Sequence, residues 1–292
     1  MKPRIICALA LGAVLAGARP ARAQWETQSM LIRPGWTAVY LHVDTSYDTL
    51  DDLVGSDPAN PIVEVWLWQP PAGTAQFVTS PQAPISGGLQ WANWGRIGTG
   101  IINTLFSLAP NTACLIRSRA TTNYIWNLKG RPVAPSYSWV ANGENLIDFP
   151  TVTNNPPPFD SLLSLAPNFE AAAQIFKYNG GDLGPLNPSM LLALHTVRAT
   201  NGQACWISSG SYFNTYFGPF QADIETEGGV AFSNSISQYS FHLRNTCASP
   251  VTVWAQLLPS DTPPDGQAPI AGVPPLLVRG ALIASNLSYT FT

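Results

Sequence analysis

The stretch Gly35–Leu41, with the sequence GWTAVYL, and its echo Gly143–Phe149, GENLIDF, decide the fold of this chain. In both stretches every second position is apolar, and this period of two is typical of a β-strand that buries one face. The apolar positions are Val39 and Leu41 in the first stretch and Ile147 and Phe149 in the second.

The side chains between these apolar positions are expected on the opposite, outer face of each strand. Tyr40 takes that place in the first stretch and Asp148 in the second. By the same alternation, His42 is expected to be an exposed or edge residue, as is His242 in a later strand.

Three further landmarks recur in the same order after each of the two strands, which indicates an internal duplication. A short helical turn follows first, then a strand with a polar residue and two aromatics at a spacing of two, and finally a small-residue strand ending in isoleucine. The pairs are Tyr47–Val54, stopped by Gly55, and Phe159–Leu165; Glu64–Trp68 and Gln174–Tyr178; and Ala113–Ile116 and Ala204–Ile207.

A third segment follows Glu227-Gly228-Gly229 and has alternating stretches at 239–244 and 251–257, joined by a hairpin-like connection over 245–250. The sequence therefore predicts a mainly β protein with two tandem, related, β-rich, sandwich-like repeats that carry short helices. A small Ig-like β-sandwich segment comes after them. The predicted boundaries are 1–23 for a signal peptide, 24–133 and 134–227 for the repeats, and 228–292 for the last segment.

The amino terminus has the three parts of an export signal. Lys2 and Arg4 precede an apolar run over 5–17, and Ala21-Arg22-Ala23 forms a small-residue cleavage site before Gln24. The run is too short to span a bilayer, and no later stretch is long and apolar enough to do so. We expect an exported protein, secreted or held in the periplasm or cell envelope.

Composition agrees with a β-rich protein that works outside the cytoplasm. Only 11% of residues are charged, while the chain holds 27 prolines and 23 glycines, which suits strands joined by long connections. Without the signal peptide, ten basic residues face seventeen acidic ones, a net charge of about −7. No basic patch remains for nucleic acid, so the expected partners are a cell-surface protein or a polysaccharide, in an oligomeric state left open.

Three cysteines remain after Cys7 leaves with the signal peptide: Cys114, Cys205 and Cys247. One disulfide with a leftover thiol and three buried thiols acting as small apolar side chains are both compatible with this number. No cysteine or histidine spacing predicts a metal site, and no cofactor is expected.

The opening Gly35-Trp36 and the later Asn145-Leu146-Ile147 with Pro150 resemble the two halves of a Gly-Trp-Asn repeat of bacterial surface and secreted proteins. The resemblance covers most of residues 31 to 215. It implies a β-rich module of large envelope or extracellular proteins. The resemblance supplies no catalytic residues.

No catalytic residue is predicted from the residue pattern. A nucleophile needs a nearby base, and only His42, His195 and His242 are available, each in a position that favours a structural role. Two carboxylates facing each other could hydrolyse glycosides, but a solvated surface role is favoured for each candidate. Those candidates are Glu64, Asp148, Asp160, Asp182, Asp223 and Glu225. Asp48, Asp51 and Asp52 lack the spacing of a calcium loop and fit the wet side of a short helix.

Tryptophan is the remaining signal. Ligand-binding candidates are Trp66, Trp68, Trp91 and Trp94, the last two in an expected loop, because flat rings on a sheet face can stack on sugars. The favoured interpretation is that these rings fill the core. The leading functional hypothesis is a non-catalytic secreted or cell-envelope structural or interaction protein. The alternatives are a carbohydrate-binding module that uses surface tryptophans and a carboxylate-dependent hydrolase.

Overall fold

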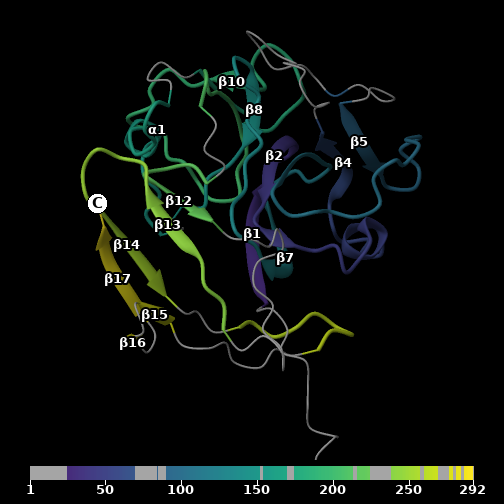
Figure 1. Cartoon of the computed structure of the whole chain (residues 1–292). Helices are drawn as coiled ribbons and strands as arrows, with labels where there is room; N and C mark the ends of the chain where they lie inside the picture. Colours follow the sequence, from purple (N-terminus) through teal and green to yellow (C-terminus); the bar gives the residue numbers. More distant parts are fainter. Residues whose placement is uncertain are drawn as a thin grey trace, which may run out of the picture.

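A computed structural model of the chain describes residues 25–69, 84, 90–151, 154–169, 174–212, 216–223, 238–256, 260–268, 276–278, 281–283 and 286–291. The protein is mainly β and built from several antiparallel sheets (Figure 1). This confirms the predicted fold class at its coarser level. The expected signal peptide, 1–23, lies outside the described residues.

Two sheets form the first half of the described chain. A four-stranded sheet has the order β2-β6-β4-β5, and a three-stranded sheet has the order β1-β7-β3. The strands are β1 (Glu26–Ile32), β2 (Gly35–Leu41), β3 (Val43–Asp44), β4 (Ile62–Trp68), β5 (Trp91–Gly95), β6 (Thr112–Ser118) and β7 (Tyr124–Pro132). A one-turn helix, η1 (Asp51–Gly55), lies between β3 and β4.

A second four-stranded sheet has the order β10-β9-β11-β8. Its strands are β8 (Glu144–Ile147), β9 (Ile175–Lys177), β10 (Ser189–Met190) and β11 (Cys205–Ser208). The helix α1 (Phe159–Leu163) lies between β8 and β9, the same place in the order that η1 takes between β2 and β4. It begins at Phe159, as expected from the sequence, and ends at Leu163, two residues before the expected end.

The two four-stranded sheets have the same topology. In each, the first strand in sequence pairs with the fourth, the fourth with the second, and the second with the third, all antiparallel. The registers also agree: Cys114 lies opposite Val39 and Leu67, and Cys205 lies opposite Ile147 and Lys177. These are the residue equivalences obtained by laying the two sequence stretches over one another.

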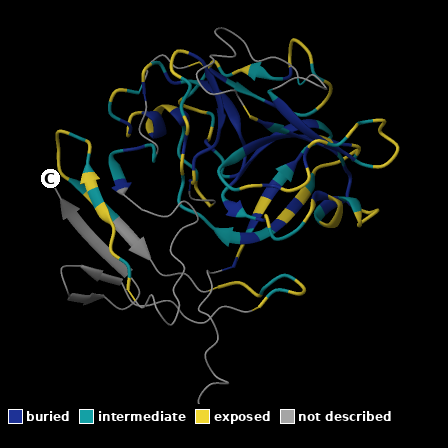
Figure 2. Ribbon diagram, turned by 45° about the vertical axis from the view of Figure 1, so that its right-hand side comes forward, coloured by how far each residue is buried: buried dark blue, intermediate teal, exposed yellow. Residues whose placement is uncertain are grey.

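The central sheet of the molecule is β2-β6-β4-β5, because apolar clusters cover both of its faces. One cluster joins the face that carries Val39 and Leu41 to β1, β7 and η1. The other joins the face that carries Ala38 and Tyr40 to the second four-stranded sheet and α1. In the part of the chain that the structure describes, three sheets are thus stacked with two apolar layers between them. Figure 2 shows the buried positions concentrated there.

The expectation that β2 buries only one face is wrong. Tyr40 is 2% exposed and Asp148 is 2% exposed, although both were expected on outer faces. The cause is the second sheet, which covers the face of β2 that the alternation alone assigns to solvent. A strand that is buried on both faces carries apolar side chains on both, and the large aromatic ring of Tyr40 is typical of such a strand.

The first half encloses one apolar cluster made of its own residues, and it shares the other cluster with the second half. Ile147 belongs to the cluster shared by both four-stranded sheets, whereas the equivalent Val39 lies in the cluster on the other side of the central sheet. The predicted boundary near residue 134 therefore crosses a continuous apolar layer.

The free edge of β2 is covered by loops of the second half. Trp36 N donates to Gly181 O at 2.9 Å, and Gly181 N donates to Pro34 O at 2.8 Å. A Cβ at Gly35, whose φ is +76°, would lie 2.3 Å from Gly181 O, so this contact requires glycine there. Covering the edge protects it from pairing with other chains.

The carboxyl-terminal strands pair differently from the expected hairpin. The strands are β12 (Phe220–Asp223), β13 (His242–Asn245), β14 (Val251–Gln256), β15 (Leu276–Val278), β16 (Ala281–Ile283) and β17 (Asn286–Phe291). β13 pairs with β12 and β14 with β17, so the connection over 245–250 joins two different sheets. The β12–β13 pair also crosses the predicted boundary at 228.

Two local expectations are also wrong. The turn expected to stop before Gly55 is a single π-type turn that includes Gly55 as its last residue. Trp91 and Trp94 lie in strand β5 and not in a loop, because pairing with β4 extends the backbone there.

Candidate functional site

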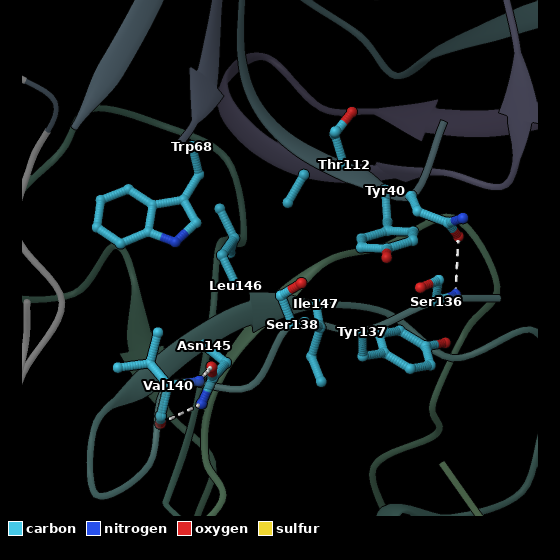
Figure 3. Close-up of a pocket in the computed structure, with 12 residues that line it drawn as sticks. Tyr40, Trp68, Thr112, Ser136, Tyr137, Ser138, Val140, Asn145, Leu146 and Ile147 are labelled. Carbon is cyan, nitrogen blue, oxygen red and sulfur yellow. Dashed lines mark hydrogen bonds between the residues drawn. The ribbon is translucent and has the colours of Figure 1, made fainter. Parts of the chain in front are cut away.

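A cavity of about 180 Å³ lies between the two four-stranded sheets and reaches the surface beside the exposed Ser136 and Ser138 (Figure 3). Residues of both halves of the molecule line it. Its lining comprises Tyr40, Trp68, Asn111, Thr112, Ala113, Ser136, Tyr137, Ser138, Val140, Asn145, Leu146 and Ile147.

Strand register places the upper wall of the cavity. Tyr40 pairs with Ala113 across β2 and β6, which sets a phenol beside a small residue and leaves room in front of the ring. Trp68 reaches the same face from β4, since side chains at alternate positions of neighbouring strands share one face. Leu146 and Ile147 of β8 form the opposite wall.

Two asparagines fasten the segment 134–140 over the cavity. Asn111, in the left-handed region with φ of 55°, donates from Nδ2 to Ala134 O at 2.9 Å and accepts from Ser136 N at 3.2 Å. Asn145 accepts from Val140 N at 2.7 Å. Each amide side chain thus replaces a backbone partner that the extended segment lacks, and the mouth has a fixed shape.

Two buried phenols, Tyr40 and Tyr137, line the cavity. The ring centroids of Tyr40 and Tyr137 are 5.9 Å apart, and Tyr137 Oη donates to Asp148 O at 2.8 Å. The hydroxyl of Tyr40 makes no hydrogen bond to any residue that the structure describes. Burial raises the pKa of both phenols, and the charge of Asp148 raises that of Tyr40 further, so both are neutral at physiological pH.

A buried polar cluster lies next to the cavity. His42 Nε2 lies 3.0 Å from Asp148 Oδ2, and Gly202 N donates to the same carboxylate oxygen. Gln28 completes the cluster by donating to Tyr40 O at 2.7 Å and accepting from His42 N at 2.9 Å. Burial raises the pKa of Asp148, while the hydrogen bond from His42 opposes that shift. His42, expected at the surface, is instead a part-buried partner of this carboxylate.

Cys205 lies opposite Lys177 in the second sheet. Burial raises the pKa of the Cys205 thiol and lowers that of the Lys177 ammonium. A thiol is a nucleophile as thiolate, so a raised pKa is the reverse of activation. Cys114, Cys205 and Cys247 all carry free thiols, and the first two are buried, so the structure selects the buried-thiol alternative for this pair.

The four tryptophan candidates are interior residues, with exposures of 5% for Trp66, 9% for Trp68, 4% for Trp91 and 1% for Trp94. Trp68 packs 5.0 Å from Trp91 and, edge to face, 4.9 Å from Trp206 of the second sheet. The alternative based on surface tryptophans does not fit this burial. Of the four, only Trp68 reaches the cavity.

The carboxylate candidates whose side chains are described lie in different surroundings. Glu64 is buried and held by Arg117 Nη1 at 2.6 Å and Trp66 Nε1 at 2.9 Å, so its charge is neutralised locally. Asp160 and Asp182 are exposed. The histidine candidates His195 and His242, the latter on β13, are exposed as well. The side chain of Asp223 and the whole of Glu225 lie outside the described residues.

Sequence reasoning missed most of the cavity lining, including Tyr40, Tyr137, Asn111 and Asn145. One signal was present: a tyrosine on the supposed outer face of an otherwise apolar strand indicates a second buried face. The loop residues at 136–140 carry no comparable pattern, because their position depends on side-chain bonds from distant asparagines.

No protein family, curated protein or solved structure matches this chain. Among the described residues, no helix is long and apolar enough to cross a membrane. In the same residues, no group of three or more histidine, cysteine and acidic side chains could hold a metal ion.

Proposed function

We propose that the protein is a non-catalytic structural or interaction protein that acts outside the cytoplasm, secreted or associated with the cell envelope. The observation that carries the proposal is the use made of its reactive side chains. Asp148, Glu64 and Cys205 are all buried; Asp148 is bonded to His42 and Gly202 N, and Glu64 is bonded to Arg117 within its own sheet.

Export is supported by the sequence of the amino terminus, in which a basic start, an apolar run and a small-residue cleavage site follow one another in the order of a signal peptide. The proposed cleavage is between Ala23 and Gln24. Low charge and many prolines and glycines support the same compartment. The Gly-Trp-Asn resemblance favours the bacterial envelope or exterior.

The finer architecture that we propose is an internal duplication followed by an Ig-like segment. The matching strand orders and the matching positions of Cys114 and Cys205 support the duplication. The pairing of β14 with β17 around β15 and β16 is compatible with a small sandwich.

An interaction role is supported by exposed apolar side chains in the loop that follows β5. Ile97, Ile102 and Phe106 are 102%, 83% and 67% exposed. Large apolar side chains that stand in solvent cost free energy and are typical of contact surfaces. A cell-surface protein or a polysaccharide remains the proposed partner class.

The experiment is expression with the native amino terminus in a bacterial host, followed by cell fractionation and amino-terminal sequencing. We expect the protein outside the cytoplasm with Gln24 as its first residue. Leu11→Arg should block export by breaking the apolar run, while Leu192→Arg, at an exposed position, should not. Cytoplasmic protein that retains Met1, or turnover of ester or polysaccharide substrates that Asp148→Asn abolishes, would refute the proposal.

A further inference from the structure

We propose that the cavity between the two four-stranded sheets binds one uncharged pyranose ring, as a free monosaccharide or as the end residue of a saccharide. The inference does not depend on export or on the scaffold role. It rests on the chemistry, the size and the accessibility of the cavity (Figure 3).

The lining carries no charged side chain. Asp148, whose backbone carbonyl is bonded to Tyr137 of the lining, has its carboxylate directed to His42 and to Gly202 N. An ionic ligand would lose its hydration without gaining a counter-charge, which costs several kcal/mol. The cavity therefore selects against phosphates, carboxylates and amines.

The cavity is lined by both apolar and polar groups, as a sugar requires. Trp68, Leu146 and Ala113 offer apolar surface, while hydroxyl groups come from Tyr40, Thr112, Ser136 and Ser138. A pyranose has apolar C–H faces and a rim of hydroxyls, so it can satisfy both. A purely apolar ring would leave the Tyr40 hydroxyl without a partner, and a small polar ion would leave the apolar surface of Trp68 unused.

Tyr40 supplies the strongest single observation. Its side chain is almost completely buried, at 2% exposure, yet its hydroxyl bonds to none of the described residues. Two side-chain atoms of the described residues are inaccessible to solvent and have no hydrogen-bond partner, and they belong to Arg33 and Glu144. The hydroxyl oxygen of Tyr40 is not one of them, so it is accessible to solvent. A buried hydroxyl normally has a partner, and here the cavity is where that partner lies.

The size limits the ligand to one ring. A volume of about 180 Å³ holds about six waters at their liquid volume of ~30 Å³ each, whereas sites for larger ligands start at ~300 Å³. The exposed serines at the mouth let the rest of a saccharide continue into solvent. The preferred ligand is thus a terminal residue and not an internal stretch of a polymer.

The test is calorimetric and NMR titration of the purified protein with glucose, galactose, mannose and N-acetylglucosamine, with glucuronate as the charged probe. We expect saturable binding of at least one neutral sugar and none of glucuronate. Tyr40→Phe should weaken binding about tenfold by removing one hydrogen bond. Ser138→Tyr should abolish binding by closing the mouth.

Matched controls separate the cavity from general effects. Tyr124→Phe removes a phenol hydroxyl from β7, and Thr122→Tyr adds a ring at an exposed loop position away from the lining. Both should bind like the original protein, and thermal unfolding checks that every variant is folded. Absence of saturable binding by all four neutral sugars, equal binding of glucuronate, or binding unchanged in both cavity variants would overturn the proposal.

Discussion

At the scale of single residues, the buried polar side chains of His42 and Asp148 join two distant stretches of the chain. His42 extends from the end of β2 to Asp148 at the end of β8, and Asp148 also accepts from Gly202 N. A buried carboxylate is costly unless it is paired and hydrogen-bonded. Here the pairing is the means by which two distant stretches of chain fix their relative position.

Asp148 predicts a specific dependence of stability on pH. Burial raises its pKa in the folded protein above the ordinary 3.8, so the folded state holds this proton more tightly than the unfolded state does. The contribution of the group to stability is fully present below the ordinary pKa and is lost as pH rises through the raised one. Asp148→Asn cannot titrate and lacks this contribution.

The measurement compares thermal unfolding of the original protein and Asp148→Asn between pH 7 and pH 3. We expect the difference in stability, original protein minus variant, to increase as pH falls. The exposed Asp182 makes a matched control, because Asp182→Asn should leave the pH profile in place. A gap between the two proteins that is constant with pH, or that moves the other way, would contradict the assignment.

At the scale of elements, the alternation of apolar residues predicted where the strands lie but not what packs against each of their faces. Strand β2 lies where the alternation places it, as do β4 and β6. Tyr40 and Asp148 were misplaced because a period of two reveals two faces but not what covers each. The carboxyl-terminal hairpin was misjudged because a turn-rich connection fixes a reversal of the chain but not the partner of each strand.

The side chain of Arg96 makes the largest set of hydrogen bonds to the connection between η1 and β4. Its guanidinium donates to the carbonyls of five residues from the end of η1 to the first residue of β4, at 2.8 to 3.3 Å; these are Val54, Gly55, Asp57, Asn60 and Ile62. This role could not be predicted from the sequence, because a lone arginine after a strand forms no recognisable pattern. Its removal leaves several part-buried carbonyls without a donor.

Arg96→Ala should lower the free energy of unfolding by about 3 kcal/mol, since hydrogen bonds to charged groups contribute more than neutral ones. Arg119→Ala is the matched control: Arg119 is exposed and its guanidinium donates to one carbonyl, Pro58 O, so the change should stay within about 0.5 kcal/mol. Urea unfolding measures both. Equal effects of the two substitutions would show that Arg96 does not hold the loop.

At the scale of the whole molecule, the central sheet works as a shared wall. Its two faces pack on different partners, and the aromatic contact of Trp68 with Trp206 crosses from one half to the other. Amino- and carboxyl-terminal parts also meet: Trp25 N donates to Ser260 Oγ at 3.0 Å, and Trp25 Nε1 to Ala268 O at 3.1 Å. Boundaries read from repeated patterns cannot reveal such sharing, because each copy taken alone resembles a complete unit.

Native-state hydrogen exchange of β6 and β11, each of which is paired on both sides within its sheet, tests the shared core most directly. Trp206 is fully buried between the sheets, and Trp206→Ala should cost about 4 kcal/mol. If the core is shared, amides of β6 lose as much protection as those of β11, while Leu192→Ala, at an exposed position, alters neither strand. Loss of protection confined to β11, with β6 unchanged, would contradict the account.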